Sequence, residues 1–396
     1  MSGLQDMETL LFIAKKSSVI SVKKCGHTFS ETKGTAFYRL RTDEDHVSNM
    51  ISLMKHGCPP QAIVATYQHD ERTVYDWYAR GGNQCQQVHE AVVENNQIDI
   101  QHVQADELCV TVVRLHGDKE IQDETMEKAD KSMQSQNGDL SISVQEVGEV
   151  PNLQEKELPC DEPTSVSANH MWMAMAMDVD TRLWLGGVVD VNRNQELIMS
   201  LAQKVRACAK SWNFLLSVDG LASYIPTFMF VFSWLIFTGQ PGRPKRMTSP
   251  GLMIAQVIKE YAKGKVSKII RRIVLGSVEA IELALKNSGC FKINTSYIER
   301  LNATFRGRLA ALVRKGRAIA HMESPVLKQG MYLTGTSYNF CYFHESLRIA
   351  AQEGSAKKWI ERTPAMAAGL TDHRWTMKEL LSYKVPPKIK TYVTHV

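Results

Sequence analysis

Three acidic residues that are far apart in the chain have the types and local settings needed to hold a divalent metal ion. Asp106 lies in the segment HVQADEL and Asp219 in FLLSVDG, and both segments contain apolar runs typical of strands. Glu299 lies in the segment YIERLNATFRGRL. Carboxylate oxygens suit hard cations such as Mg2+, and two-metal phosphoryl chemistry needs one carboxylate that bridges both ions. We therefore expect these three carboxylates to converge on a metal site for phosphodiester chemistry on DNA.

The segment Tyr297–Leu309 predicts an amphipathic helix that carries the third acid. A period of 3.6 residues places Glu299, Asn302 and Arg306 on one face. The opposite face is an apolar stripe formed by Ile298, Leu301, Phe305 and Leu309. The helix would thus pack through its stripe and present its polar face to the site.

Each acid also has a structural explanation. Asp219 with Gly220 could form a turn, and Glu299 could be a charge favoured by the dipole at a helix N-terminus. Glu107 could compete with Asp106 as a ligand. The joint placement of the acids, on two strand ends and one helix, is what favours a metal site.

The elements before Asp219 alternate in a way that indicates an α/β fold. Ile98–Val113 predicts a strand, a brief interruption and a second strand, with Asp106 closing the first. Residues 171–180 and 182–190 predict a hairpin, Gln195–Lys210 an amphipathic helix, and residues 211–219 a buried strand. This order predicts a ribonuclease H-like core, in which the two acid-bearing strands lie side by side.

Composition divides the remainder of the chain. Residues 116–168 contain 4 Lys against 13 acidic residues, which predicts a disordered insertion within a hairpin loop. The apolar stretch 225–238 is too short to span a bilayer and predicts a buried helix or strand pair. Helix and strand remain open alternatives for residues 253–274. We expect an unassigned segment at 1–40, a helix-turn-helix domain at 41–95, a catalytic core at 96–325 with a second insertion region at 225–290, and a helical C-terminal region at 326–396.

The predicted helix-turn-helix consists of a leading helix from Asp43 to Gly57, a helix after Pro59, and a third helix that a Gly81-Gly82 pair would stop. In such modules the last helix enters the major groove of DNA. Its candidate DNA-binding residues are Arg72, Thr73, Tyr75 and Arg80, with Asp76 also exposed. The alternative is an ordinary helical subdomain.

Positive charge is concentrated in the second half of the chain. Residues 241–320 contain 17 Lys and Arg against 4 Asp and Glu, which indicates either a polyanion partner or a solvated basic surface. Within this block, the GRPKR segment at 242–246 resembles the minor-groove hook of architectural DNA proteins, but one short copy favours a linker over a hook. Its candidate DNA-binding residues are Arg243, Lys245 and Arg246. The eight cysteines include no CxxC pair, which is typical of reduced thiols in a cytosol.

Several of these motifs together resemble the DDE transposases of bacterial insertion sequences, and most closely the insertion-sequence-one type. They are QADE at 104–107, VDG at 218–220 and ERxNxxxRxRL at 299–309. The segments YNFxYxHESL at 338–347 and ERTPAMAAGL at 361–370 are similar to the tails of related transposases. The resemblance extends from about Cys58 to Leu381, and the segment at 299–309 is its most specific part.

The resemblance implies a transposase that binds the inverted-repeat ends of a mobile element and catalyses DNA cleavage and strand transfer. Asp106, Asp219 and Glu299 would be the catalytic metal ligands for two Mg2+ or Mn2+ ions, and Asn302 and Arg306 would orient the substrate phosphate. It also implies double-stranded DNA as partner, a homodimer or higher oligomer when ends are paired, no membrane, and a cytoplasmic, nucleoid-associated location.

Two departures from the family pattern support an alternative. Cys109 stands where an aromatic residue commonly follows the first acidic pair, and the acidic insertion at 116–168 is unusual. The chain could therefore be a catalytically inactive DNA-binding repressor or a domesticated transposase remnant.

Overall fold

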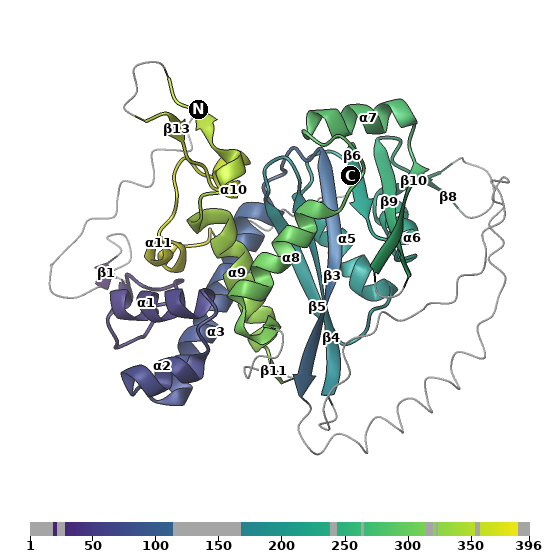
Figure 1. Cartoon of the computed structure of the whole chain (residues 1–396). Coiled ribbons are helices and arrows are strands. Elements are labelled where there is room, and N and C mark those ends of the chain that lie inside the picture. Colours follow the sequence, from purple (N-terminus) through teal and green to yellow (C-terminus); the bar gives the residue numbers. More distant parts are fainter. Residues whose placement is uncertain are drawn as a thin grey trace.

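The computed structural model describes residues 19–21, 28–113, 168–237, 244–262, 265–313, 320–321, 324–352 and 357–386. Almost all of the predicted disordered insertion lies outside these residues, as does the DNA-binding candidate Arg243. The part of the chain that is described combines a mixed β-sheet with helices on both faces, which confirms the predicted α/β class (Figure 1).

The sheet has the strand order β10-β9-β6-β3-β4-β5. Strands β3, β4 and β5 form an antiparallel meander, β6 pairs in parallel with β3, and β9 pairs in parallel with β6. Strand β10 returns antiparallel to β9, and the short strand β11 pairs in parallel with the far end of β3. The bounds are β3 His102–Val113, β4 Ala168–Asp178, β5 Trp184–Asp190, β6 Phe214–Val218, β9 Leu252–Ala262, β10 Lys265–Leu275 and β11 Ala320–His321.

The predicted interruption after Asp106 is wrong, because β3 is one continuous strand of 12 residues. Strand β4 pairs with it residue by residue from Val103 to Val113, which satisfies the backbone on that side without a break. Apolar side chains on both sides of the acidic pair, including Ala105, Leu108 and Val110, are buried. Asp106 therefore lies in the middle of a strand, not at its end.

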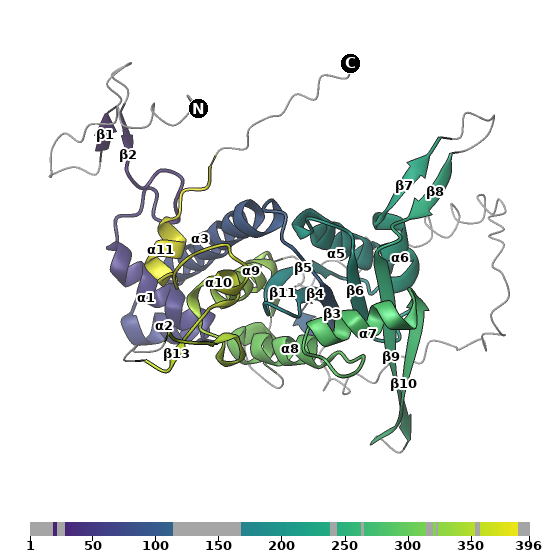
Figure 2. The same cartoon turned by 90° about the horizontal axis from the view of Figure 1, so that it is seen from above.

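Helices cover both faces of the sheet. Helix α5 (Gln195–Cys208) contacts β4 and β5, whereas α8 (Ser296–Arg308) contacts β3 and β4 from the opposite face (Figure 2). Helix α7 (Val278–Asn287) lies beside α8 on the same side. Helices α5 and α8 confirm the predictions for residues 195–210 and 297–309. The predicted apolar stripe of α8 is buried, with Ile298, Leu301, Phe305 and Leu309 each at most 4% exposed.

The three predicted N-terminal helices are present as α1 (Glu44–Lys55), α2 (Pro60–Tyr67) and α3 (Glu71–His89). The predicted stop at the glycine pair is wrong, because α3 continues for seven residues beyond it and leads into the π-helical segment η1 (Glu90–Glu94). A Cβ on Gly82 would lie 2.5 Å from the Cβ of Gln329 on α9. The pair therefore permits close helix packing and does not end the helix.

Helix α9 (Val326–Cys341) lies between α3 and the sheet and is buried along almost all of its length. As a result, buried residues of α1, α3, α9 and the sheet belong to one continuous hydrophobic cluster. Further elements are β1 (Val19–Ser21), β2 (Thr28–Ser30), η2 (Ala310–Leu312), η3 (Glu345–Leu347), β12 (Ile349–Ala350), β13 (Trp359–Ile360), α10 (Pro364–Ala367) and α11 (Met377–Ser382). No helix in the described residues has the length and apolar character needed to cross a bilayer.

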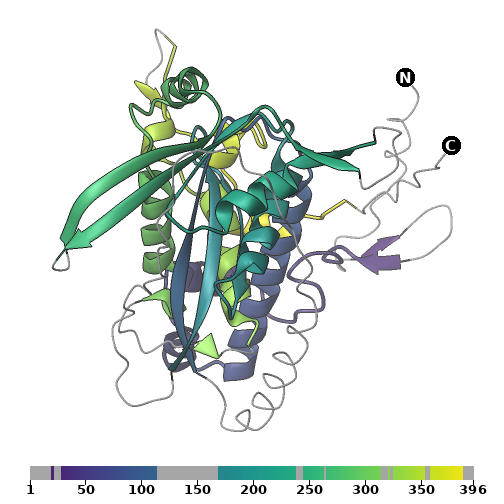
Figure 3. The ribbon, with the colours of Figure 1, turned by 90° about the vertical axis from the view of Figure 1, so that its right-hand side faces the viewer.

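The region between Asp219 and α7 contains two hairpins that leave the body of the molecule (Figures 2 and 3). Residues 225–237 of the stretch predicted to be a buried helix or strand pair lie in and around α6 (Tyr224–Val231) and β7 (Ser233–Ile236), which pairs with β8 (Lys245–Thr248). Helix α6 is buried at Phe228 and Val231, as predicted. Trp234 and Leu235 of β7 are exposed, because a two-stranded hairpin outside the sheet has no layer to cover it. The undecided residues 253–274 form the hairpin of β9 and β10.

We expect Gly335→Ala to destabilise the protein by about 3 kcal/mol, because overpacking a filled core forces side chains and backbone apart. A Cβ on Gly335 would enter the buried indole ring of Trp184. Urea denaturation would measure the loss. The matched control is Gly307→Ala on α8, where nothing lies within 4 Å of the added carbon and a gain of about 0.5–1 kcal/mol is expected. Equal effects of the two substitutions would contradict this packing.

Candidate metal centre

The parallel pairing of β3 with β6 brings Asp106 and Asp219 together. The register aligns Gln104 with Ser217, so that two residues further along, Asp106 lies opposite Asp219, just after the end of β6. Strand β3 continues past this point, and the chain after β6 turns away, with the Leu221 amide donating to Asp219 Oδ1 at 3.0 Å. The two carboxylates thus meet where one parallel strand ends beside a longer one.

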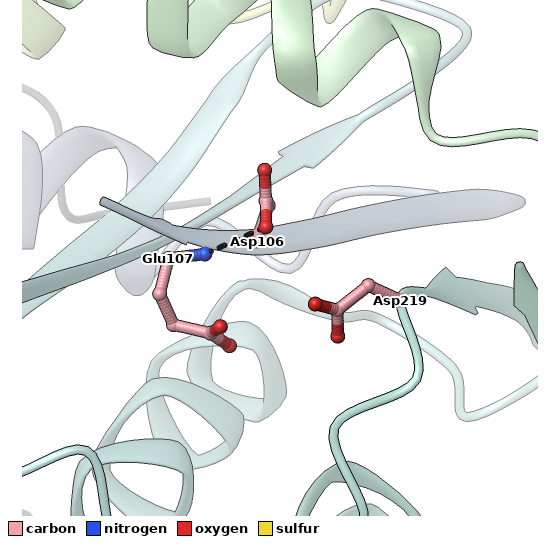
Figure 4. Close-up of side chains that lie close together, drawn as sticks. All are labelled: Asp106, Glu107 and Asp219. Atoms are coloured by element: carbon pink, nitrogen blue, oxygen red, sulfur yellow. Dashed lines mark hydrogen bonds between the residues drawn. The ribbon is translucent and has the colours of Figure 1, made fainter. Parts of the chain in front are cut away.

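Glu107 joins this pair. One oxygen from each of Asp106, Glu107 and Asp219 lies within 4.8 Å of the others, so the three carboxylates could hold a metal ion. Figure 4 shows Asp106 and Glu107 on opposite sides of β3, as successive residues of a strand must be, with Asp219 approaching from the end of β6. We call Asp106, Glu107 and Asp219 the acidic cluster.

Burial makes the acidic cluster electrostatically costly without a cation. The pKa of Asp106 is raised to about 7, mainly by burial and further by the charges of Glu107 and Asp219. The pKa of Glu107 is also raised, again mainly by burial and then by Asp219. The Glu107 side chain is 1% exposed, and a hydrogen bond from the Tyr224 hydroxyl and the charge of Arg193 offset part of the rise in its pKa. A divalent cation fits this environment, since it would supply positive charge beside three buried or half-buried carboxylates.

Arg193 partly neutralises the cluster from the side of α5. Its Nη2 atom lies 3.0 Å from Glu107 Oε2 and 3.6 Å from Asp219 Oδ2. The guanidinium also lies over the Trp172 ring, 4.9 Å from its centroid. Sequence reasoning missed this residue, because it lies in the loop between β5 and α5 and no local motif marks it. The sequence predicted Glu107 only as an alternative ligand to Asp106. Its position next to Asp106 could have indicated that both carboxylates join the cluster.

Helix α8 contributes Asn302 to the opposite side of the cluster. Asn302 Nδ2 donates to Asp106 Oδ2 at 2.7 Å, while the backbone amide of Glu107 donates to Asp106 Oδ1 at 3.0 Å. Asn302 is only 3% exposed, and its buried Oδ1 atom has no hydrogen-bond partner among the residues that the structure describes. These bonds fix the orientation of the Asp106 carboxylate. Arg306 is half-buried one turn further along α8.

Glu299 lies near the acidic cluster but is not part of it. Its charge contributes to the raised pKa of Asp106, after the contributions of burial, Glu107 and Asp219. Its Oε1 atom accepts from Lys259 Nζ at 2.5 Å and from Thr295 Oγ1 at 2.9 Å. Of the three acids expected to converge, Asp106 and Asp219 are therefore together, whereas Glu299 is paired with a lysine of β9.

The predicted DNA-binding residues of α3 lie mostly in intramolecular contacts. Arg80 bonds to Asp76 at 2.6 Å and to the carbonyl of Tyr38 at 3.0 Å. The Tyr75 hydroxyl accepts from Gln61 at 2.5 Å. Arg72 is exposed and Thr73 is half-buried.

The GRPKR segment enters strand β8. Lys245 is exposed there. Arg246 donates to Ser233 Oγ at 2.9 Å and lies over the Phe230 ring, 4.1 Å from its centroid. Lys245 and Arg246 therefore belong to the β7–β8 hairpin, and Arg246 also links this hairpin to α6.

Comparison with models of known protein families found no match to this chain, and a search of curated proteins found no similar sequence.

Proposed function

We propose that the chain is a DDE transposase with a ribonuclease H-like core. The observation that carries this proposal is the meeting of Asp106 and Asp219 across two adjacent parallel strands, with Asn302 of α8 bonded to Asp106. The strand order also supports such a core. It consists of an antiparallel meander of β3, β4 and β5, with β6 added in parallel beside β3 and β9 in parallel beside β6. The motif at 299–309, which supplies Asn302, is the most specific part of the resemblance.

Asp106 and Asp219 would hold divalent ions, Mg2+ or Mn2+, with Glu107 or Glu299 completing the ligand set. Two such ions, when bound, activate the attacking oxygen and stabilise the departing one in phosphodiester cleavage and transesterification. Asn302 keeps the Asp106 carboxylate in a fixed orientation. Arg193 reduces the mutual repulsion of Glu107 and Asp219 until cations arrive. Glu299 would become a ligand only by giving up its ion pair with Lys259.

The substrate in this proposal is double-stranded DNA carrying the inverted-repeat ends of the mobile element. Helices α2 and α3 would recognise these ends, through Arg72 in particular, because its side chain is exposed. Cutting both ends in one complex requires at least a dimer. The cut would leave a 3'-hydroxyl, which then attacks target DNA.

A second candidate function is a catalytically inactive DNA-binding protein. The observation that favours it is that two cations of the chain itself already pair with acids at the site. Arg193 contacts Glu107 and Asp219, and Lys259 pairs with Glu299. In such a protein, Arg193 and Lys259 would take the place of metal ions beside these acids, and the site would be stable but inactive.

Cleavage of labelled DNA separates the two functions. Duplexes made from the DNA that flanks the reading frame on each side would be incubated with purified protein and Mg2+, and again with Mn2+. The proposal predicts nicks with 3'-hydroxyl ends at the tips of inverted repeats. Salt-dependent binding to the same duplexes, with no nick under either metal, would reject the transposase and support the DNA-binding protein.

A further inference from the structure

The hairpin of β9 and β10, which we call the basic arm, carries a strong excess of positive charge. Residues 252–275 contain six Lys and Arg and one acidic residue, Glu260. The arm forms the edge of the sheet at its base and then extends well beyond the body of the molecule (Figures 2 and 3). On the outer part of β10, Lys265 and Lys268 are exposed. Nearer the base, Lys259 pairs with Glu299, Arg271 donates to the Ile293 carbonyl and Arg272 donates to Gln256.

Packing within the chain does not account for the outer part of the basic arm. Strand β10 is exposed at every position from Lys265 to Ile269. The apolar side chains there are also exposed, with Tyr261 at 56%, Val266 at 47% and Ile269 at 44%. A two-stranded ribbon that buries no apolar face is marginal in water. Its length and charge are instead suited to a large anionic partner.

The base of the basic arm contacts Glu299, which lies near the acidic cluster, on one face of the ribbon and the backbone of Asp219 on the other. On one face, Lys259 pairs with Glu299 at 2.5 Å. On the other face, Gln256 Nε2 donates to the backbone carbonyl of Asp219 at 3.1 Å, and Arg272 Nη2 donates to Gln256 Oε1 at 2.5 Å. A partner lying along the arm would therefore lie beside the acids.

We propose that the basic arm binds the sugar–phosphate backbone of duplex DNA and holds it against the acidic cluster. The role of the cluster in this inference rests on the proposed function, whereas binding by the arm does not. The major groove of B-form DNA admits a two-stranded ribbon, and exposed lysines on the ribbon would reach phosphates. Lys265 and Lys268, both exposed on the outer part of β10, are the contacts that this geometry favours.

The composition of the arm distinguishes duplex DNA from other nucleic acids. Single-strand binding generally uses several aromatic platforms on which bases stack, and Tyr261 is the one exposed aromatic residue among the described residues of the arm. The major groove of duplex RNA is deep and narrow, so it would not admit the ribbon. Duplex DNA is therefore the partner that fits both the charge and the shape.

Fluorescence anisotropy with a labelled DNA duplex, in EDTA, tests the inference without cleavage. The variant Lys265→Glu/Lys268→Glu is expected to bind about tenfold more weakly, and the slope of log affinity against log salt should fall by about 2. The matched control is Lys33→Glu/Lys328→Glu, which makes the same charge change at two exposed lysines outside the arm. The control should bind within about twofold of wild type. Equal weakening in both variants would overturn the inference, because net charge alone would then explain binding.

Two further measurements complete the test. Unchanged far-ultraviolet circular dichroism and an unchanged sedimentation coefficient are expected for the arm variant. A changed oligomeric state with unchanged DNA affinity would reassign the arm to contact with a second copy of the chain. Equal affinity for duplex RNA or single-stranded DNA would also overturn the choice of partner.

The two proposals can fail separately. If the arm variant binds DNA normally and the wild type cleaves it, DNA binding by the arm is rejected and the proposed transposase activity stands. If the arm variant binds DNA more weakly and the wild type does not cleave it, the transposase activity is rejected and DNA binding by the arm stands.

Discussion

Asp219→Asn is expected to slow Mg2+-dependent DNA cleavage by about 10³-fold or more. A bound metal supplies several kcal/mol of transition-state stabilisation, and each ~1.4 kcal/mol is a factor of ten in rate. Asp219 is one of the two strand-borne acids that meet at the cluster, so its charge is needed to hold the ions. The amide oxygen of Asn can still accept from the Leu221 amide, as Asp219 Oδ1 does. Single-turnover cleavage of a labelled element end would measure the rate.

The matched control is Glu196→Gln, which removes one negative charge from an exposed position in the first turn of α5. Its cleavage rate should stay within about twofold of wild type, because surface changes away from a site have small effects. DNA binding by Asp219→Asn, measured in EDTA, should also be close to wild type. Cleavage by Asp219→Asn at the wild-type rate would show that the cluster is not the reaction centre.

The affinity for Mn2+ is expected to fall about 100-fold between pH 7 and pH 5. Metal ligands must be deprotonated, so each bound proton that the metal displaces costs about tenfold per pH unit below the pKa of the ligand. The pKa of Asp106 is raised to about 7, chiefly by burial, so this carboxyl is protonated over most of that range. Isothermal titration calorimetry at pH 5, 6, 7 and 8 would measure the affinity.

The raised pKa of Asp106 also determines whether the stability of the metal-free protein rises or falls with pH. Because the folded-state pKa of Asp106 lies above its ordinary value of 3.8, the folded protein binds more protons than the unfolded chain between about pH 4 and 7. The free energy of unfolding therefore decreases as pH rises through that window, by an amount on the order of a few kcal/mol. A saturating divalent ion should reverse this loss at pH 7 and above.

Asp106→Asn is the control for both effects, because it removes the titrating group at that position. Asn302 can rotate its amide so that its unpartnered Oδ1 accepts from the new side chain, which keeps the contact between β3 and α8. This variant should bind Mn2+ weakly at every pH and lose the part of the stability change that Asp106 contributes between pH 4 and 7, while the part from Asp178, whose pKa burial also raises to about 7, remains. A wild-type pH profile in Asp106→Asn would place the titrating group elsewhere.

Sequence periodicity predicted the elements that depend on local patterns. The apolar stripe of Ile298, Leu301, Phe305 and Leu309 indicated α8, and the buried run before Asp219 indicated β6. The hairpin of β4 and β5 and the helix α5 followed from patterns of the same kind. Each of these elements buries a continuous apolar surface, so the spacing of apolar residues in its sequence indicates the element.

Features that depend on tertiary contacts were missed or wrongly predicted. The glycines at 81 and 82 suggested a helix end, but they are places where α1 and α9 approach α3 closely. The polar pair in β3 suggested a break, but full pairing with β4 keeps the strand continuous. Arg193 reaches the cluster from a loop, and Lys259 reaches Glu299 from a strand 40 residues earlier in the chain. Neither contact leaves a local pattern in the sequence.

Anomalous diffraction from crystals soaked in Mn2+ tests the central claim most directly. We expect an anomalous peak with carboxylate oxygens of Asp106 and Asp219 as ligands at about 2.1 Å, and Glu107 or Glu299 completing the set. We also expect the peak to be lost in crystals of Asp219→Asn. Mn2+ bound elsewhere, with the Asp106 and Asp219 carboxylates still paired only with groups of the chain, would contradict a metal centre between β3 and the end of β6.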